Sequence, residues 1–374
     1  MRLDFLPSVA RLDFFPSRTL TVYLAKVFIV RILAVLLMLV LVLQMLDLLS
    51  ESGKILAAAG NSESDLWTYI GLRAPQLVAR FLPYSVLLAT IITLATLNQH
   101  SEVIAMKAAG LSAHQILAPL LLTALAVSVV SFGFNERVVT RSNSALNAWQ
   151  AVDYGKVPKV SGVRSNVYVT DGHNIIAAAT LTGHGKAMRM TGVTFYERDA
   201  NDMIGQQIRA TSATYANPGW RLENPVRFDV QTAETVPLEP LVVARTLTPD
   251  QVAISSVDAD GQSLGELSQS IRELDAAGRR TNELKGKWWH KISGPLAAFL
   301  MPLLGAVAAF GLARSGQLFV RAVIGMSLGF AYFVVDNAAL AMGNFGGYPP
   351  LLAAWAPFLL FLLVGETVLV RTEE

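Results

Sequence analysis

Few side chains in this sequence of 374 residues have types and spacings that could do chemistry. There is no cysteine, which excludes disulfides, thiol catalysis and cysteine-based metal sites. The five histidines show no metal-ligand spacing such as H-E-x-x-H, and no G-x-x-x-x-G-K-[ST] nucleotide motif occurs. The nearest run, from Gly183 to Lys186, lacks both the spacing and the hydroxyl residue and is interpreted as a turn. We therefore expect no catalytic residue, no metal site and no cofactor bound by this chain.

Three carboxylates in or beside apolar runs are the remaining candidates for chemistry: Asp47, Asp336 and Glu366. A carboxylate at membrane depth is costly and by default suggests a function such as proton coupling. The alternative is that Asp47 and Asp336 are interfacial or pair with a nearby Arg or Lys. Glu366 lies close to the end of its run, where a charge costs less. Both interpretations stay open at this point.

The apolar runs themselves decide the class of protein. Hydrophobic residues make up 53% of the chain and charged residues 16%, which is too apolar for an ordinary soluble protein. The near-neutral charge balance gives no reason to expect nucleic acid as a partner. A membrane-crossing helix needs about 20 mostly apolar residues. Six segments meet that requirement: Val22–Leu46, Leu77–Leu97, Ile116–Phe134, Ile292–Leu312, Ala322–Met342 and Leu351–Val370.

Lys and Arg in short loops predict the orientation of these spans. Arg2, Arg11 and Arg18 precede the first span, and Arg371 follows the last. Such residues favour the cytoplasmic side, so both termini are expected there and residues 135–287 are expected outside. The predicted division is a cytoplasmic segment (1–20), three spans (21–134), the outside domain (135–287) and three further spans (288–374).

The outside domain has the pattern of an antiparallel β-sheet followed by a helical connector. Its predicted strands are Val163–Thr170, Asn174–Leu181, Val193–Arg198, Ile208–Tyr215, Trp220–Asn224 and Val226–Gln231. Short strands separated by turn signals favour a sandwich or jelly roll. Its aromatic residues are predicted to be core: Phe195, Tyr196, Tyr215, Trp220 and Phe228. Ser263 and Glu266 form an S-x-x-E capping box that starts the connector helix.

One semi-polar stretch, Asn98–Gln115, joins the second and third spans on the expected cytoplasmic side. We call it the connecting segment. Ile104, Ala108 and Leu111 have helical spacing, Glu102 suits the first turn, and Gly110 could end the helix. The segment is either a simple interfacial connector or a docking helix for a cytoplasmic partner, because a small apolar face beside a carboxylate suits a groove on another protein.

The run SEVIAMKAAG (Ser101–Gly110) resembles the coupling helix of the lipopolysaccharide export permeases, the LptF/LptG family. The flanking sequence agrees over nearly the whole chain. Matching features are Ala74-Pro75 through Pro83 at the second span, Val334-Val335-Asp336 in the fifth, and Tyr348-Pro349-Pro350 before the sixth. The C-terminal end is more similar to the LptG branch than to the LptF branch. The fold expected from pattern and resemblance together is an α-helical membrane protein with six transmembrane helices and an inserted, all-β periplasmic jelly-roll-like domain.

The resemblance implies an inner-membrane permease subunit of an ABC exporter that extracts lipopolysaccharide and passes it toward the outer membrane. The implied partners are an LptF-like second permease, an LptB-like cytoplasmic ATPase dimer, which holds the ATP and Mg²⁺, an LptC-like periplasmic protein, and the lipopolysaccharide. The residues implied at the ATPase are Ser101, Glu102, Met106 and Gly110. Those implied at the gate or seam with the second permease are Asp47, Gly325, Gly329 and Asp336.

Lipid A phosphates call for cations at the outer ends of the spans. The candidates are Lys54, Arg73, Arg80, Arg137, Arg141, Lys285, Lys287 and Lys291, although headgroup snorkelling is an equal alternative for any one of them. The basic cluster that the family carries after the first span is thin here. Other hypotheses are another ABC-type permease, an ion-coupled transporter using the three carboxylates, and a membrane scaffold whose β domain recruits partners. An enzyme is disfavoured because no catalytic constellation stands out.

Overall fold

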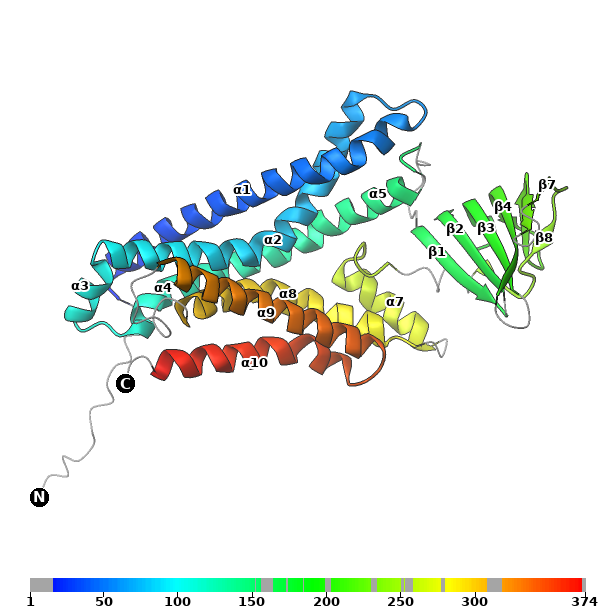
Figure 1. Cartoon of the computed structure of the whole chain (residues 1–374). Helices are drawn as coiled ribbons and strands as arrows, with labels where there is room; N and C mark the ends of the chain where they lie inside the picture. Colours follow the sequence, from blue (N-terminus) through cyan, green and yellow to red (C-terminus); the bar gives the residue numbers. More distant parts are fainter. Residues whose placement is uncertain are drawn as a thin grey trace, which may run out of the picture. The chain divides into compact units, whose positions relative to one another are not determined.

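The computed structural model describes residues 16–151, 153–155, 164–172, 174–183, 185–198, 203–229, 234–249, 252, 258–276, 280–307 and 318–371. Long helices come first and last along the chain, and the strands lie between them (Figure 1). The chain divides into two compact units. The first unit comprises Met1–Leu41, Arg80–Gly133 and Trp289–Glu374, and the second comprises Val42–Ala79 and Phe134–Trp288.

Five helical segments in the described part of the chain are long and apolar enough to cross a membrane. They are α1 (Arg18–Ala57), α2 (Glu63–Gln99), the continuous helix that begins with α4 (Ala113–Phe134), α9 (Leu318–Asn344) and α10 (Pro350–Arg371). Their positions agree with five of the six expected spans. The remaining one, Ile292–Leu312, overlaps α8 (Asn282–Ala306), but its end lies outside the described residues. The sixth span therefore stays a prediction.

The helices extend well beyond the apolar runs that predicted them. α1 continues past Leu46 to Ala57, and α2 begins at Glu63 rather than Leu77. After α4, the π-helical segment Asn135–Val139 leads directly into α5 (Thr140–Ala151). An apolar run in the sequence marks only the part of a helix that would cross the hydrocarbon layer. The helix itself can continue beyond that layer where neighbouring elements pack against it. Residues 140–151 of the expected outside domain are therefore helical, and the first described strand begins at residue 164.

The helices of the first unit share one apolar core. It includes Phe28 of α1, Leu94 of α2, Ile116 of α4 and Leu304 of α8, all of which are almost completely buried. Large apolar side chains on the same helices instead face outward, such as Leu37, which is 61% exposed. An apolar surface of this extent on long helices is expected of a multi-pass membrane protein rather than of a soluble one.

The β domain is an antiparallel sheet of eight strands within the described residues. The strands are β1 (Arg164–Asp171), β2 (Asn174–Thr182), β3 (Arg189–Arg198), β4 (Ile204–Tyr215), β5 (Trp220–Glu223), β6 (Val226–Asp229), β7 (Thr235–Pro237) and β8 (Val242–Val243). Their order is β1-β2-β3-β4-β5-β8, and β6 pairs with both β4 and β7. A strand is present at each of the six predicted positions, although residues 163, 230 and 231 of those predictions lie outside the described residues. Between β2 and β3, a short 3-10 helix (Gly185–Ala187) follows the predicted turn position. The jelly-roll topology stays a prediction.

The centre of the sheet is organised around Trp220. Its side chain is fully buried, and its indole Nε1 donates a hydrogen bond to the Leu247 carbonyl at 3.1 Å. Phe195 is also buried and Tyr215 packs against the same cluster, as predicted. Tyr196 and Phe228 are only half-buried, so the core prediction was wrong for these two residues. Tyr196 of β3 and Phe228 of β6 are not part of the main apolar cluster of the sheet.

The connector helix α7 (Leu264–Ala276) begins with the predicted capping box. The Ser263 backbone N–H donates to the Glu266 carboxylate at 2.8 Å, and the Glu266 N–H donates to the Ser263 hydroxyl at 3.4 Å. Such reciprocal bonds satisfy amide groups that have no partner inside the helix. At the start of α8, Trp288 Nε1 donates to the Ser268 hydroxyl of α7 at 2.8 Å, which joins the two helices.

The close packing of α9 against α10 at Gly343 can be tested. A Cβ added at Gly343 would lie 2.4 Å from Ala353 Cβ, an atom that no side-chain rotation can move away. We expect Gly343→Ala to destabilise the protein by about 1–3 kcal/mol through overpacking. Gly71→Ala is the matched control, since nothing lies within 4 Å of its new Cβ. Thermal unfolding in detergent should separate the two variants, and equal melting temperatures would contradict this packing.

Candidate functional site

The connecting segment contains one short helix, α3 (Glu102–Ala108), between the end of α2 and the start of α4. Ser101 precedes it in the left-handed conformation with φ 59°. After the helix, Gly110 N–H donates to the Lys107 carbonyl at 3.0 Å and Leu111 N–H donates to the Met106 carbonyl at 3.1 Å. This pair of bonds, with Gly110 at φ +88°, is a Schellman ending. The prediction that Gly110 ends the helix is confirmed.

The two faces of α3 have different environments. Val103 and Met106 are buried in the apolar core of the first unit. Ile104 is 61% exposed, and Ala108 is exposed as well. Leu111 follows the helix and packs against the core, so the predicted face of Ile104, Ala108 and Leu111 is only partly present. The Met106 side chain, which the resemblance placed at the ATPase, is buried within this chain.

The carboxylate of Glu102 borders the exposed face of α3. Tyr23 Oη of α1 donates to its two oxygens at 3.4 and 3.3 Å, and His100 Nδ1 lies 3.9 Å away. Its side chain remains about one-third exposed, at 35%. A short apolar strip beside an accessible carboxylate has the chemistry of a protein-docking surface rather than of a catalytic centre.

Four of the eight predicted phosphate-binding cations are already paired with carboxylates. Arg73 contacts Asp47 at 3.0 Å, Lys54 contacts Glu51 at 2.9 Å, Lys285 contacts Asp275 at 2.8 Å and Lys287 contacts Asp260 at 3.2 Å. The hydrogen bonds from Lys285 and Thr281 lower the pKa of the Asp275 carboxyl below its ordinary value. These cations therefore have less charge to offer an anionic ligand.

The other four predicted cations differ. Arg80, Arg137 and Arg141 have exposed side chains, and the described residues provide no ion pair for any of them. Arg137 lies in the π-helical segment, and Arg141 lies in the first turn of α5. Lys291 of α8 has an interaction within the chain. The structure thus separates three accessible arginines from cations that are already engaged.

Each carboxylate considered for ion coupling has a partner in the structure. Asp47 pairs with Arg73, as expected from the alternative that this carboxylate has a nearby Arg or Lys as its partner. Asp336 is 5% exposed, and its Oδ2 lies 3.8 Å from His290 Nε2. Glu366 lies 3.4 Å from His114 Nε2. No group of three or more His, Asp or Glu that could hold a metal ion occurs in the part of the chain that the structure describes.

The glycines expected at the seam with a second permease lie inside the first unit. Gly325 and Gly329 are buried. A Cβ added at Gly329 would lie 2.2 Å from Leu87 Cδ2 of α2, so the close helix contact that this motif predicts is made with a helix of the same chain.

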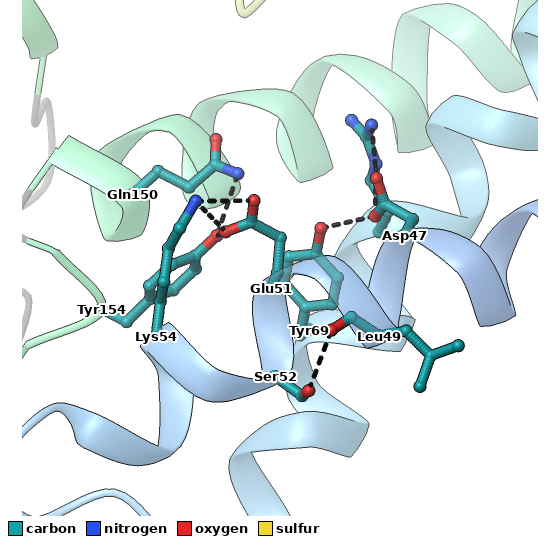
Figure 2. A network of polar contacts seen from close by, with 9 residues as sticks. Asp47, Leu49, Glu51, Ser52, Lys54, Tyr69, Gln150 and Tyr154 are labelled. Carbon is teal, nitrogen blue, oxygen red and sulfur yellow. Dashed lines mark hydrogen bonds and ion pairs between the residues drawn. The ribbon is translucent and has the colours of Figure 1, made fainter.

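Sequence reasoning missed a cluster of side chains at the end of α1. We call it the α1 clasp and define it as Asp47, Glu51, Tyr69, Arg73 and Tyr154. Figure 2 shows the Tyr69 hydroxyl directed at Asp47, and Glu51 beside Tyr154 and Lys54. Burial raises the pKa of Tyr154 to about 12, which moves it further above neutral pH than the ordinary value for tyrosine. No local sequence pattern connects residues that are so far apart along the chain.

Comparisons with known proteins agree with this architecture. The family profile described as "Lipopolysaccharide export system permease LptF/LptG" matches residues 22–371. The lipopolysaccharide export system permease protein LptG of Escherichia coli K12 is 25% identical over 310 residues, covering 81% of this chain and 84% of that protein. The LptG protein of Haemophilus influenzae is 24% identical over 324 residues, covering 85% and 89%.

The ending of α3 can be tested at Gly110. Nothing lies within 4 Å of a Cβ added there, so a substitution strains only the backbone at positive φ. We expect Gly110→Val to lower the hydrogen-exchange protection of residues 102–111, because the left-handed backbone conformation destabilises the helix end by about 1–2 kcal/mol when the residue is not glycine. Gly110→Asn should have a smaller effect, because asparagine tolerates the left-handed region. Equal protection in the two variants would show that the left-handed ending is not required.

Proposed function

The chain belongs to the lipopolysaccharide export system permease family LptF/LptG, which makes it a lipopolysaccharide transport permease, and we propose that it is driven by ATP hydrolysis on a separate ATPase. In this function the protein extracts lipopolysaccharide from the inner membrane. It passes the lipid to a periplasmic protein that leads toward the outer membrane. ATP and Mg²⁺ bind to the ATPase, since the sequence of this chain contains no nucleotide motif.

The observation that carries the proposal is the two-sided character of α3. Val103 and Met106 hold the helix to the core, while Ile104 and Ala108 remain exposed beside Glu102. A helix of seven residues is unstable alone, so the buried side must hold it in shape for a partner to use the other side. The ATPase therefore docks on Ile104 and Ala108, with Ser101 and Gly110 shaping the ends and Glu102 supplying the charge.

The substrate phosphates bind at the exposed arginines. An Arg guanidinium can give a phosphate two parallel charge-assisted hydrogen bonds. Arg80, Arg137 and Arg141 have this capacity available, whereas Arg73, Lys54, Lys285 and Lys287 are engaged with carboxylates. We assign the phosphates first to the three arginines. Lys291 and the four engaged cations contribute only where the lipid displaces their present partners.

The membrane orientation and the partners complete the proposal. The Lys and Arg distribution favours cytoplasmic termini, a cytoplasmic connecting segment and a periplasmic β domain. An LptF-like permease packs on α1 and α9, where outward side chains such as Leu41 and Phe330 offer apolar surface, rather than on Asp47, Gly325, Gly329 and Asp336, whose contacts lie within this chain. An LptC-like protein receives the lipid beyond the β domain.

Docking of the ATPase is tested at Ile104. We expect Ile104→Arg to remove most of the ATPase that co-purifies with the permease complex, because losing a central apolar anchor typically costs about 2 kcal/mol or more. The matched control is Ile204→Arg in β4, where the isoleucine is 44% exposed. Unchanged ATPase recovery with Ile104→Arg would reject α3 as the docking helix.

Phosphate binding is tested by neutralising cations in two groups. The double variant Arg137→Gln/Arg141→Gln should lower the amount of lipopolysaccharide that co-purifies, as measured by mass spectrometry. The control, Lys285→Gln/Lys287→Gln, removes the same formal charge from residues that are already paired. We expect roughly a tenfold larger loss for the arginines, corresponding to about 1.4 kcal/mol. Equal losses in the two variants would indicate general charge attraction instead.

A further inference from the structure

Asp47 and Glu51 stand one helical turn apart on α1 and bind different parts of the second unit. Arg73 of α2 donates from Nε and Nη2 to the two Asp47 oxygens, at 3.0 and 3.1 Å. Tyr69 of α2 donates to Asp47 Oδ2 at 2.5 Å. Tyr154, which follows α5, donates to Glu51 at 2.7 Å. The two carboxylates thus bind α1 to two neighbouring elements, and the Arg–carboxylate fork fixes direction as well as distance.

The two tyrosine rings extend the same joint into an apolar cluster. Ile55, Tyr69, Leu146, Trp149 and Tyr154 are buried together and come from α1, α2, α5 and the segment after α5. The ring of Tyr154 meets those of Tyr69 and Trp149 edge-on, with centroids 6.2 and 5.2 Å apart. Each tyrosine therefore contributes both a packed ring and a hydroxyl that binds a carboxylate.

The backbone at Tyr154 is fixed as firmly as its side chain. Asp153 and Tyr154 both have positive φ, at 48° and 60°, a conformation that surrounding contacts must maintain. The Tyr154 carbonyl accepts hydrogen bonds from Asn61 at 2.8 Å and from Trp149 Nε1 at 3.0 Å. Asn61 also donates to the Ile55 carbonyl of α1 at 2.9 Å. A strained residue held from several sides indicates a position that the fold specifies closely.

The clasp lies on a helix that also contacts the connecting segment. α1 is continuous over 40 residues, a length of about 60 Å. Near its start, Tyr23 binds Glu102. Near its end, the clasp binds α2 and the segment after α5, and α5 itself contacts strands β1 and β2. One helix thus carries contacts to the docking segment and to the elements that precede the β domain.

We propose that the α1 clasp is the joint that passes a displacement of α1 to α5 and the β domain, with Asp47 and Tyr154 as its positioning residues. The inference rests on the proposed function, because that function supplies the displacement. Arg73 then serves mainly as the partner of Asp47 and not as a phosphate ligand. Loosening the joint leaves ATP hydrolysis running while less lipid moves for each ATP consumed.

The first test uses the whole complex in proteoliposomes, with ATP hydrolysis and lipid transfer measured together. Asp47→Asn and Tyr154→Phe should each retain ATPase activity but move several-fold less lipid per ATP. Tyr168→Phe is the control, because that tyrosine is 63% exposed in β1. The exchange Asp47→Arg/Arg73→Asp should recover part of the coupling if the pair is a joint. Single variants that keep the wild-type ratio, or an exchange variant worse than both singles, would overturn the proposal.

A second test does not depend on lipid transport. The native chain has no cysteine, so spin labels can be placed at Leu49→Cys on α1 and Trp67→Cys on α2, both of which are highly exposed. We expect a narrow distance distribution in the native sequence and in Tyr168→Phe, and a broader one in Asp47→Asn and Tyr154→Phe. An unchanged distribution in those variants would overturn the joint. If the wild-type complex moves no lipid, the proposed function is wrong. The spin-label distances would still test whether Asp47 and Tyr154 hold α1 in place.

Discussion

A carboxylate on a membrane helix must find a partner, and that constraint determines which charges of this protein remain available. Leaving an ionised group unpaired in a low-dielectric surrounding is too costly for a marginally stable fold. Asp47 accordingly holds Arg73, and Asp336 faces His290. The pairing with Asp47 removes Arg73 from the set of cations that could meet an anionic lipid. The same requirement that stabilises the helices therefore also selects the candidates for substrate binding.

This selection also bears on the choice between transport mechanisms. An ion-coupled transporter needs carboxylates that are available to exchange protons during its cycle, and the Asp47 carboxylate is already engaged by the Arg73 guanidinium and the Tyr69 hydroxyl. The connecting segment points to a different energy source. Its buried side is held by the chain and its exposed side is open, which is consistent with the docking surface that we propose for the ATPase.

Local pattern predicted the elements well where the physical cause was itself local. The capping box at Ser263 and Glu266, the glycine ending at Gly110 and the predicted strands depend on residues within a few positions of one another. The burial of the Met106 side chain was harder to predict, because a seven-residue helix has too few turns for its buried and exposed faces to be distinguished from the sequence. Of the clasp, the sequence predicted only that Asp47 could pair with a nearby Arg or Lys, and it did not identify the other members. Tyr154 reaches Glu51 across 103 positions, and Asp47 had no visible connection to Tyr69.

A helix that transmits force from a partner must be held by the chain on one face and accessible on the other. The length of a helix determines how far along the molecule its displacement is transmitted. α3 is too short to carry motion, so it can only receive it and pass it to the helices it touches. α1 is long and continuous and contains no proline, the residue that most often kinks a helix. Side-chain contacts at its two ends are therefore the weakest part of any path along it. Transmission of a displacement along α1 is therefore lost first where these side-chain contacts loosen. At the α1 clasp, the positive-φ backbone and the buried tyrosines are the features that would keep the contacts rigid.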